Sequence, residues 1–211
     1  APAEAEDCLF INVRTSNIGN DTLLPVMVWI HGGSHQAGAG SSEFYQANAL
    51  VENGVVLVTF NYRLGPFGYM AHPALTEEAG TSGNYGLMDQ AAALRWVRDN
   101  IRSFGGDPDN VTIFGESAGA QSVSELMAST IADGLYHKAI LESGTSSYNA
   151  NYLSEAPLPG SRSMESIGEE FLSTFVDRTA TAAELRSIPA ASIITRAEQR
   201  ADLAGYFLPN V

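Results

Sequence analysis

The residue best placed to do chemistry is Ser117, which lies in the sequence Gly-Glu-Ser-Ala-Gly of residues 115–119. β-Branched and aromatic residues precede it at 111–115, and an alanine-rich stretch follows at 118–128. This spacing predicts a strand, a sharp turn that holds the serine, and a helix. Such a turn is strained and exposes the hydroxyl, which is then a nucleophile for acyl transfer. Gly115 and Gly119 suit the turn, because a Cβ at either position would collide with the neighbouring strand or helix.

A second motif, His-Gly-Gly-Ser at residues 31–34, follows the apolar run 25–31. Ligands of open parallel sheets bind at the carboxyl ends of strands, where this motif is expected to lie. Successive glycines allow backbone N–H groups to converge on one point, as the oxyanion of acyl transfer requires. The N–H of Ala118, directly after the serine, is the expected further donor. The alternative is that Gly32 and Gly33 form only a tight turn.

Other segments alternate between strand and helix patterns, which predicts an α/β fold with a largely parallel sheet and right-handed crossovers. The expected strands are residues 8–13, 25–31, 55–61, 111–115 and 138–143. The expected helices are residues 44–53, 84–104 and 118–128, with weaker patterns at 163–176 and 181–188. One apolar stripe with helical spacing lies in the long helix: Leu87, Ala91, Leu94, Val97, Ile101 and Phe104.

The 211 residues are enough for one domain or a large part of a bigger one. We expect residues 1–145 to form the core sheet that carries both motifs. After Gly144 the sequence becomes polar and irregular, so residues 146–211 are expected to form a variable, helical substrate-pocket region.

Composition excludes several classes of partner. The net charge is −13, from 11 basic and 24 acidic residues, which disfavours nucleic acid and anionic membrane surfaces. No apolar run approaches the ~18 residues of a membrane-spanning helix, and the N-terminus lacks the pattern of a signal peptide. A single cysteine and four histidines without ligand spacing predict no metal site, and no cofactor is expected.

These motifs resemble the type-B carboxylesterase/lipase family, which includes cholinesterases, liver-type carboxylesterases and fungal lipases. The similarity runs collinearly through about the first 150 residues. It is carried by six segments, at residues 6–13, 28–34, 61–68, 83–90, 104–119 and 139–145.

The resemblance implies an α/β-hydrolase fold and a triad in which an Asp or Glu and a His serve Ser117. It implies oxyanion donors from the backbone of Gly33, Ser34 and Ala118. It also implies that Glu116 is a second carboxylate near the triad histidine. The alternative is that Glu116 only fills a polar niche. Ser143 resembles a serine that bonds the triad acid.

Two further features follow from the same resemblance. Arg63 and Asp89 resemble a buried salt bridge that ties the segment 61–68 to the long helix. Cys8 resembles one half of a disulfide whose other cysteine lies upstream, and the alternative is a small buried thiol. His35 occupies a position where the family usually has an aromatic residue.

The expected triad is incomplete within these residues. Its order along such a fold is Ser, acid, His, yet only His137 follows Ser117, and it precedes the strand predicted at 138–143. We therefore expect His137 at the wrong end of that strand. The chain is interpreted as the N-terminal part of a larger enzyme, inactive alone, with its remainder possible as a second chain.

Two classes of function remain. One is a serine hydrolase of small-molecule carboxylic esters or lipids; the other is a catalytically silent adhesion or binding module on the same scaffold. The intact Ser117 and Glu116 favour the hydrolase. Sequons at Asn20 and Asn110, although such patterns also arise by chance, fit an exported, extracellular glycoprotein without stable membrane insertion.

Overall fold

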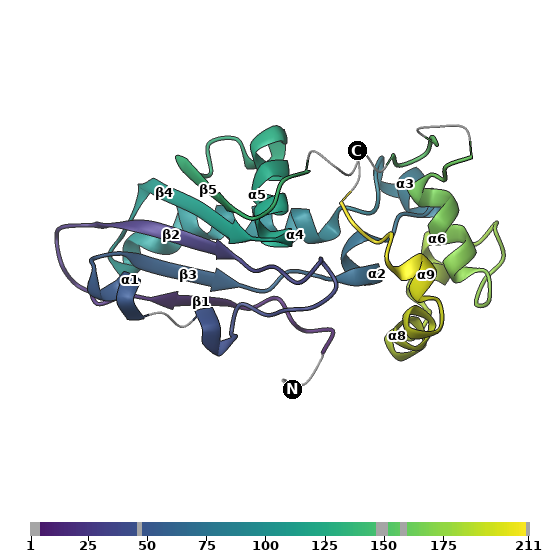
Figure 1. Ribbon diagram of the computed structural model, residues 1–211, viewed down its shortest axis with the longest axis horizontal. Coiled ribbons are helices and arrows are strands. Elements are labelled where there is room, and N and C mark those ends of the chain that lie inside the picture. The colour runs from purple at the N-terminus through teal and green to yellow at the C-terminus, as the bar shows by residue number, and fades with distance from the viewer. Residues whose placement is uncertain (1–4, 46–47, 147–151, 157–159, 210–211) are drawn as a thin grey trace. The chain divides into compact units, whose positions relative to one another are not determined.

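The computed structural model describes residues 5–45, 48–146, 152–156 and 160–209. They form two compact units (Figure 1), which are described separately. The sheet unit consists of Asp7–Tyr62 and Leu87–Ser146. The helical unit consists of Ala1–Glu6, Arg63–Gly86 and Ser147–Val211. The segment between the third strand and the long helix therefore clusters with the C-terminal residues.

The sheet unit is built on five strands in the order β1-β3-β2-β4-β5. Their bounds are β1 (Ile11–Arg14), β2 (Leu24–Ile30), β3 (Val56–Phe60), β4 (Gly106–Glu116) and β5 (Lys138–Glu142). β1 runs antiparallel to β3, and the other pairs are parallel. The predicted α/β class with a mostly parallel sheet is confirmed. β3 is buried along its whole length, as expected of a strand covered on both faces.

Helices connect the strands of this unit. They are η1 (Glu43–Tyr45), α1 (Asn48–Glu52), α4 (Tyr85–Asn100), η2 (Ile101–Phe104), α5 (Ala118–Ala128) and η3 (Thr130–Ala132). α5 has the predicted bounds and packs on β2, β4 and β5 (Figure 1). The apolar stripe of the long helix is buried from Leu87 to Ile101, whereas Phe104 is half-buried. This stripe anchors the helix in the core.

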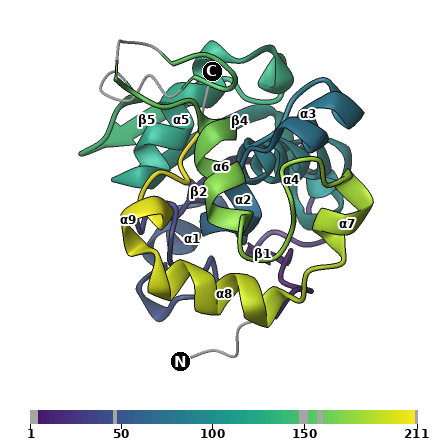
Figure 2. The same ribbon diagram turned by 90° about the vertical axis from the view of Figure 1, so that its right-hand side faces the viewer.

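The helical unit contains α2 (Gly65–Tyr69), α3 (Pro73–Ala79), α6 (Met164–Leu172), α7 (Ala182–Arg186), α8 (Ala190–Gln199) and α9 (Ala201–Ala204). α7 lies beside α3 (Figure 2). The two weaker helical patterns are confirmed as α6 and α7, each shorter than predicted. Ser163 caps α6, and Thr181 forms a capping box with Glu184 at α7. α2, α3, α8 and α9 were not predicted.

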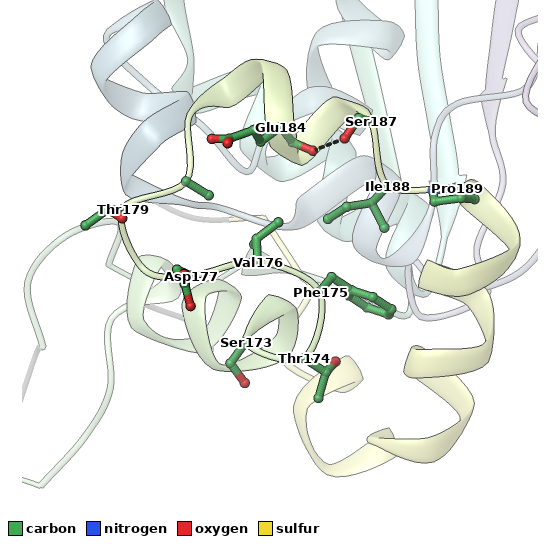
Figure 3. Close-up of a pocket in the computed structure, with 11 residues that line it drawn as sticks. Ser173, Thr174, Phe175, Val176, Asp177, Thr179, Glu184, Ser187, Ile188 and Pro189 are labelled. Carbon is green, nitrogen blue, oxygen red and sulfur yellow. Dashed lines mark hydrogen bonds between the residues drawn. The ribbon is translucent and has the colours of Figure 1, made fainter.

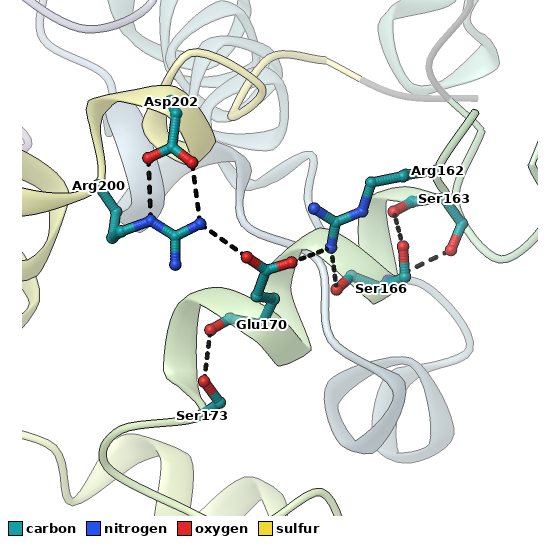
Figure 4. A network of polar contacts seen from close by, with 7 residues as sticks. All are labelled: Arg162, Ser163, Ser166, Glu170, Ser173, Arg200 and Asp202. Carbon is teal, nitrogen blue, oxygen red and sulfur yellow. Dashed lines mark hydrogen bonds and ion pairs between the residues drawn. The ribbon is translucent and has the colours of Figure 1, made fainter. Parts of the chain in front are cut away.

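Two surface features belong to this unit. A network joins Glu170 to Arg162 and Arg200, at 2.8 and 2.6 Å, and Arg200 to Asp202 (Figure 4). It ties α6 to α9, although exposed ion pairs of this kind stabilise little. An open hollow of about 660 Å³ lies between the end of α6 and the start of α8 (Figure 3). Glu184 lines it but is engaged in the capping box.

Candidate active site

The two sequence motifs meet where the strand order reverses. From β2 the chain adds β3 on one side, and it later returns to place β4 on the other side of β2. Such a switch point, at the carboxyl ends of the strands, is where open α/β sheets bind ligands. Ile30 at the end of β2 pairs with Gly115 near the end of β4. The His-Gly-Gly-Ser segment and Ser117 therefore leave adjacent strands at the same edge of the sheet.

Ser117 occupies the predicted turn between β4 and α5. Its backbone angles are φ 56° and ψ −120°, a conformation that is strained for a residue with a side chain. Its N–H donates to the carbonyl of Glu142 on β5 over 2.9 Å. That hydrogen bond fixes the turn to the next strand. The N–H of Ala118, in the first turn of α5, cannot reach an intrahelical acceptor, which suits it to an incoming oxygen.

The glycines on either side of the serine are required by close packing. A Cβ on Gly119 would lie 2.0 Å from the carbonyl oxygen of Ile30, and one on Gly115 would lie 2.5 Å from the carbonyl carbon of Gly119. Both distances are impossible for real atoms. The predicted collision with the neighbouring strand and helix is thus confirmed for these two positions.

The loop after β2 turns tightly against the serine. A Cβ on Gly32 would lie 3.3 Å from the Cβ of Ser117 and 2.6 Å from the carbonyl oxygen of Glu116. Gly33 has φ 112°, and its carbonyl accepts from the N–H groups of Gln36 and Ala37, both at 3.0 Å. Gly33 and Ser34 are exposed, so their backbone is accessible beside Ser117.

Two residues without the freedom of glycine continue this turn. Ser34 and His35 both have φ 57°, in the left-handed region that L-residues avoid. Ser34 faces solvent, whereas the side chain of His35 is fully buried. His35 therefore does not line an open pocket, although its position is one where an aromatic side chain is expected.

His35 takes part in a buried polar chain. Its Nε2 lies 3.0 Å from the Oγ of Ser122 on α5, and Gln90 Nε2 on α4 donates to the same oxygen over 3.0 Å. All three side chains have no exposed surface. Burial, with a smaller contribution from His31, lowers the pKa of His35 to about 4, so the imidazole is neutral at pH 7.

His31 is held by Tyr62. The Tyr62 hydroxyl donates to the carbonyl of His31 over 2.6 Å, and the two rings stack with centroids 4.4 Å apart. Burial raises the pKa of Tyr62 and lowers that of His31, so both rings stay neutral. His31 Nδ1 lies 2.8 Å from the carbonyl oxygen of Gly32, and this fixes the entry to the loop.

One titratable group near this cluster was not predicted from the sequence. Glu125 lies on α5, and one carboxylate oxygen accepts from Gln121 Nε2 over 3.1 Å. The other oxygen is buried and has no hydrogen-bond partner among the described residues. Burial raises the pKa of Glu125 to about 7, and the Gln121 hydrogen bond opposes this shift only in part.

The other acid and serine predicted beside the nucleophile are exposed. Glu116 ends β4 and pairs in register with Glu142. Ser143 follows β5 with φ 56°. Their proposed roles toward the triad remain predictions, because no described residue supplies the histidine or acid that they would serve.

His137 directly precedes β5, at the N-terminal end of that strand, as expected. Its N–H donates to the carbonyl of Val111 over 2.8 Å, and its Nδ1 accepts from the Val111 N–H over 3.1 Å. Ser117 comes six residues after Val111 along the extended strand, a span of roughly 20 Å. His137 is therefore too far from Ser117 to accept a proton from its hydroxyl.

The other residues singled out in the sequence were assigned a salt bridge, a disulfide and glycosylation sites. The Arg63 guanidinium lies 5.3 Å from the centroid of the Tyr85 ring within the helical unit; its ion pair with Asp89 stays a prediction. The carbonyl of Cys8 accepts from Asn61, and its disulfide is likewise untested. Asn20 is exposed, while Asn110 is half-buried and accepts from Lys138.

Sequence reasoning missed Gln90, Ser122 and Tyr62. One signal was available, because Gln90 falls on the same helix face as the apolar residues Leu87, Ala91 and Leu94. A polar side chain within such a stripe needs a buried partner.

Among the described residues, no helix is long and apolar enough to cross a membrane. The chain is 56% identical over 146 residues to the para-nitrobenzyl esterase of Bacillus subtilis, covering 69% of the chain and 29% of that protein. It is 48% identical over 145 residues to the fumonisin B1 esterase of Sphingopyxis macrogoltabida, covering 68% of the chain and 27% of that protein. The chain thus spans less than a third of these relatives.

Solved structures agree with these sequence matches. A thermophilic pNB esterase superposes on the whole chain with a TM-score of 0.85 and 41% identity, and 42% of that protein is covered. A carboxylesterase of Geobacillus stearothermophilus gives a TM-score of 0.84 at 38% identity, again over the whole chain and 43% of its own length. These neighbours are α/β-hydrolase esterases, so the partial α/β-hydrolase fold is confirmed. The model of the carboxylesterase family matches residues 2–211, and the chain belongs to this family.

Proposed function

We propose that the complete protein is a serine hydrolase of carboxylic esters and that Ser117 is its nucleophile. The observation that carries the proposal is the strained turn of Ser117 beside the loop at Gly32, at the switch point of the sheet. Membership of the carboxylesterase family supports it further.

In this mechanism, Ser117 Oγ attacks the ester carbonyl carbon to form a tetrahedral intermediate, and collapse of that intermediate breaks the bond to the alcohol, which leaves with the proton taken from the serine, and gives the acyl-serine. Negative charge develops on the carbonyl oxygen in the tetrahedral intermediate. The backbone N–H groups of Gly33, Ser34 and Ala118 are the proposed donors, and each well-placed donor of this kind contributes roughly 3 kcal/mol to the transition state. Water then attacks the acyl group and releases the carboxylic acid.

The serine proton needs a base, which we assign to a histidine outside residues 1–211, oriented by an acid that also lies outside them. The position of His137 supports this assignment. Residues 1–211 alone should hydrolyse p-nitrophenyl esters no faster than their Ser117→Ala variant. Addition of the remainder of the enzyme, in the same chain or as a second chain, should restore turnover.

The substrate is proposed to be a small-molecule carboxylic ester, with esters of lipids as one possible class. The para-nitrobenzyl and fumonisin B1 esterases among the relatives support an ester substrate without fixing its acyl chain or leaving group. Activity of the complete protein against p-nitrophenyl esters of rising acyl length would define this preference. Turnover that survives Ser117→Ala would overturn the proposed nucleophile.

We also propose that the complete protein is exported and glycosylated at Asn20. The asparagine is exposed, in a polar turn, and offers more room for a glycan than half-buried Asn110. Glycosidase treatment of protein from its native source should lower its mass. An unchanged mass would remove this support for export.

A further inference from the structure

The residue types at 33–35 do not by themselves favour the backbone conformation of this turn. Ser34 and His35 adopt two consecutive left-handed conformations, although neither is a glycine. L-Residues disfavour that region, so neighbouring structure must hold the turn in place. The turn also carries two of the three proposed oxyanion donors, which makes whatever holds it relevant to catalysis.

The side chain of His35 is the part of this turn that reaches into the core. It is fully buried, and its Nε2 lies 3.0 Å from the hydroxyl oxygen of Ser122. Ser122 lies on α5, the helix that begins directly after Ser117. The hydrogen bond therefore joins the oxyanion turn to the same rigid element that follows the nucleophile.

Gln90 completes the chain from a third element. Its Nε2 donates to Ser122 Oγ over 3.0 Å, so the hydroxyl is shared between α4 and the turn. Gln90 is also fully buried. A buried polar chain of this kind specifies one arrangement, because shifting any member would leave a polar group without a partner.

We propose that His35 is a positioning residue for ester hydrolysis. Through Ser122 it holds the backbone of Gly33 and Ser34 at a fixed distance from Ser117, so that their N–H groups meet the developing oxyanion. The inference rests on the proposed function and deepens it. The neutral state of His35, whose pKa burial lowers to about 4, supports this arrangement, since a charged imidazole would be costly at this buried position.

The first test uses the complete protein that contains this chain. His35→Phe keeps an aromatic ring but removes the hydrogen bond, and Ser122→Ala removes its partner. Each should lower kcat by about tenfold or more with little change in KM, because oxyanion stabilisation acts in the transition state. His35→Gln, whose amide nitrogen can reach Ser122, should retain more kcat than His35→Phe.

The matched control is Ser124→Ala. Ser124 lies on the same helix and is partly buried, whereas Ser122 is fully buried, and it bonds Ser146 and not the turn. Its loss should leave kcat unchanged. The double variant His35→Phe/Ser122→Ala should be no slower than the slower single variant, because both changes break one chain. Unchanged kcat in both single variants, or losses that multiply in the double variant, would overturn the proposal.

A readout that does not depend on activity separates this inference from the proposed function. Amide hydrogen exchange of a peptide that contains residues 32–38 should accelerate in Ser122→Ala and not in Ser124→Ala. That result supports the positioning role even if the wild-type protein shows no Ser117-dependent turnover. Equal exchange in both variants contradicts it. If His35→Phe fails to fold, Ser122→Ala carries the test alone.

Discussion

Gly32 and Ser117 are so close that a Cβ on the glycine would lie 3.3 Å from the Cβ of the serine and 2.6 Å from the carbonyl oxygen of Glu116. This contact places the loop after β2 directly against the nucleophile. It explains why the loop begins with glycine and why the backbone that follows can face a carbonyl bound at Ser117.

Gly32→Ala should therefore abolish most ester hydrolysis by the complete protein. The added methyl group must displace the backbone of Glu116 or the loop itself, and either shift would misalign the proposed oxyanion donors. We expect a fall of about a hundredfold in kcat, comparable to loss of one donor. Gly205→Ala is the matched control, because like Gly32 it lies outside the left-handed region, with φ −64°, and the nearest atom to its added Cβ is at an ordinary contact distance of 3.6 Å. Equal losses in both variants would contradict the account.

Substitution of Ser34 distinguishes its backbone from its side chain. Ser34→Ala and Ser34→Gly keep the N–H donor and should retain most of kcat, with Gly favoured by the left-handed φ of 57°. Ser34→Val keeps the N–H but opposes that φ through its branched side chain, so it should lose activity. A loss of about a hundredfold in Ser34→Ala would instead identify the hydroxyl as the donor.

Much of this site follows from the sequence, and what does not follow has a physical cause. The elbow at Ser117 and the bounds of α5 were predictable, because local pattern and steric need coincide there. The early start of β4 at Gly106 was not, because it depends on the pairing of Gly106 with Leu24 of β2, after which the register shifts to Val111 with Val26 and leaves Asp107 and Pro108 within an irregularity of the strand. The burial of His35 was not predictable either, because its partner Ser122 is 87 residues away.

The buried carboxyl of Glu125 predicts a stability that falls with rising pH. Its pKa in the folded protein is about 7, against 4.5 in the unfolded chain, so the folded state binds the extra proton between these values. The contribution of protonated Glu125 to folding stability is fully present below pH 4.5 and is lost as the pH rises through 7. Glu125→Gln should thus melt at a higher temperature than wild type at pH 8, and the difference should vanish near pH 4.5.

The measurement is thermal unfolding of both proteins across this pH range. A gain of 1 kcal/mol corresponds to roughly 2–4 °C for a domain of this size. Glu52→Gln, which removes an exposed carboxylate at the end of α1, is the control and should show no such pH dependence. Equal melting temperatures of Glu125→Gln and wild type at pH 8 would show that the carboxyl is solvated.

His35 predicts the opposite trend at acid pH. Its pKa falls from 6.5 in the unfolded chain to about 4 in the folded protein, so the unfolded state binds more protons between these values. The contribution of neutral His35 to folding stability is present above pH 6.5 and is lost as the pH falls through 4. The full shift corresponds to on the order of 3 kcal/mol. His35→Phe should remove that component of acid sensitivity.

The comparison must isolate His35 from the groups around it. His31 and Tyr62 pack against it, and Ser122 and Gln90, which do not titrate, face it from α5 and α4. Burial lowers the pKa of His31 and His72 as well. The informative quantity is therefore the difference in unfolding free energy between wild type and His35→Phe from pH 7 to pH 4. A difference that does not change with pH would contradict the buried, neutral assignment.

The central claim is that Ser117 forms an acyl-enzyme, and covalent labelling tests it most directly. The complete protein should react with a fluorophosphonate probe, and peptide mapping by mass spectrometry should place the adduct on Ser117 Oγ. The Ser117→Ala variant, which keeps the glycines of the elbow, should remain unlabelled. Labelling of wild type no stronger than that of Ser117→Ala would contradict the claim and favour a catalytically silent binding module on the same fold.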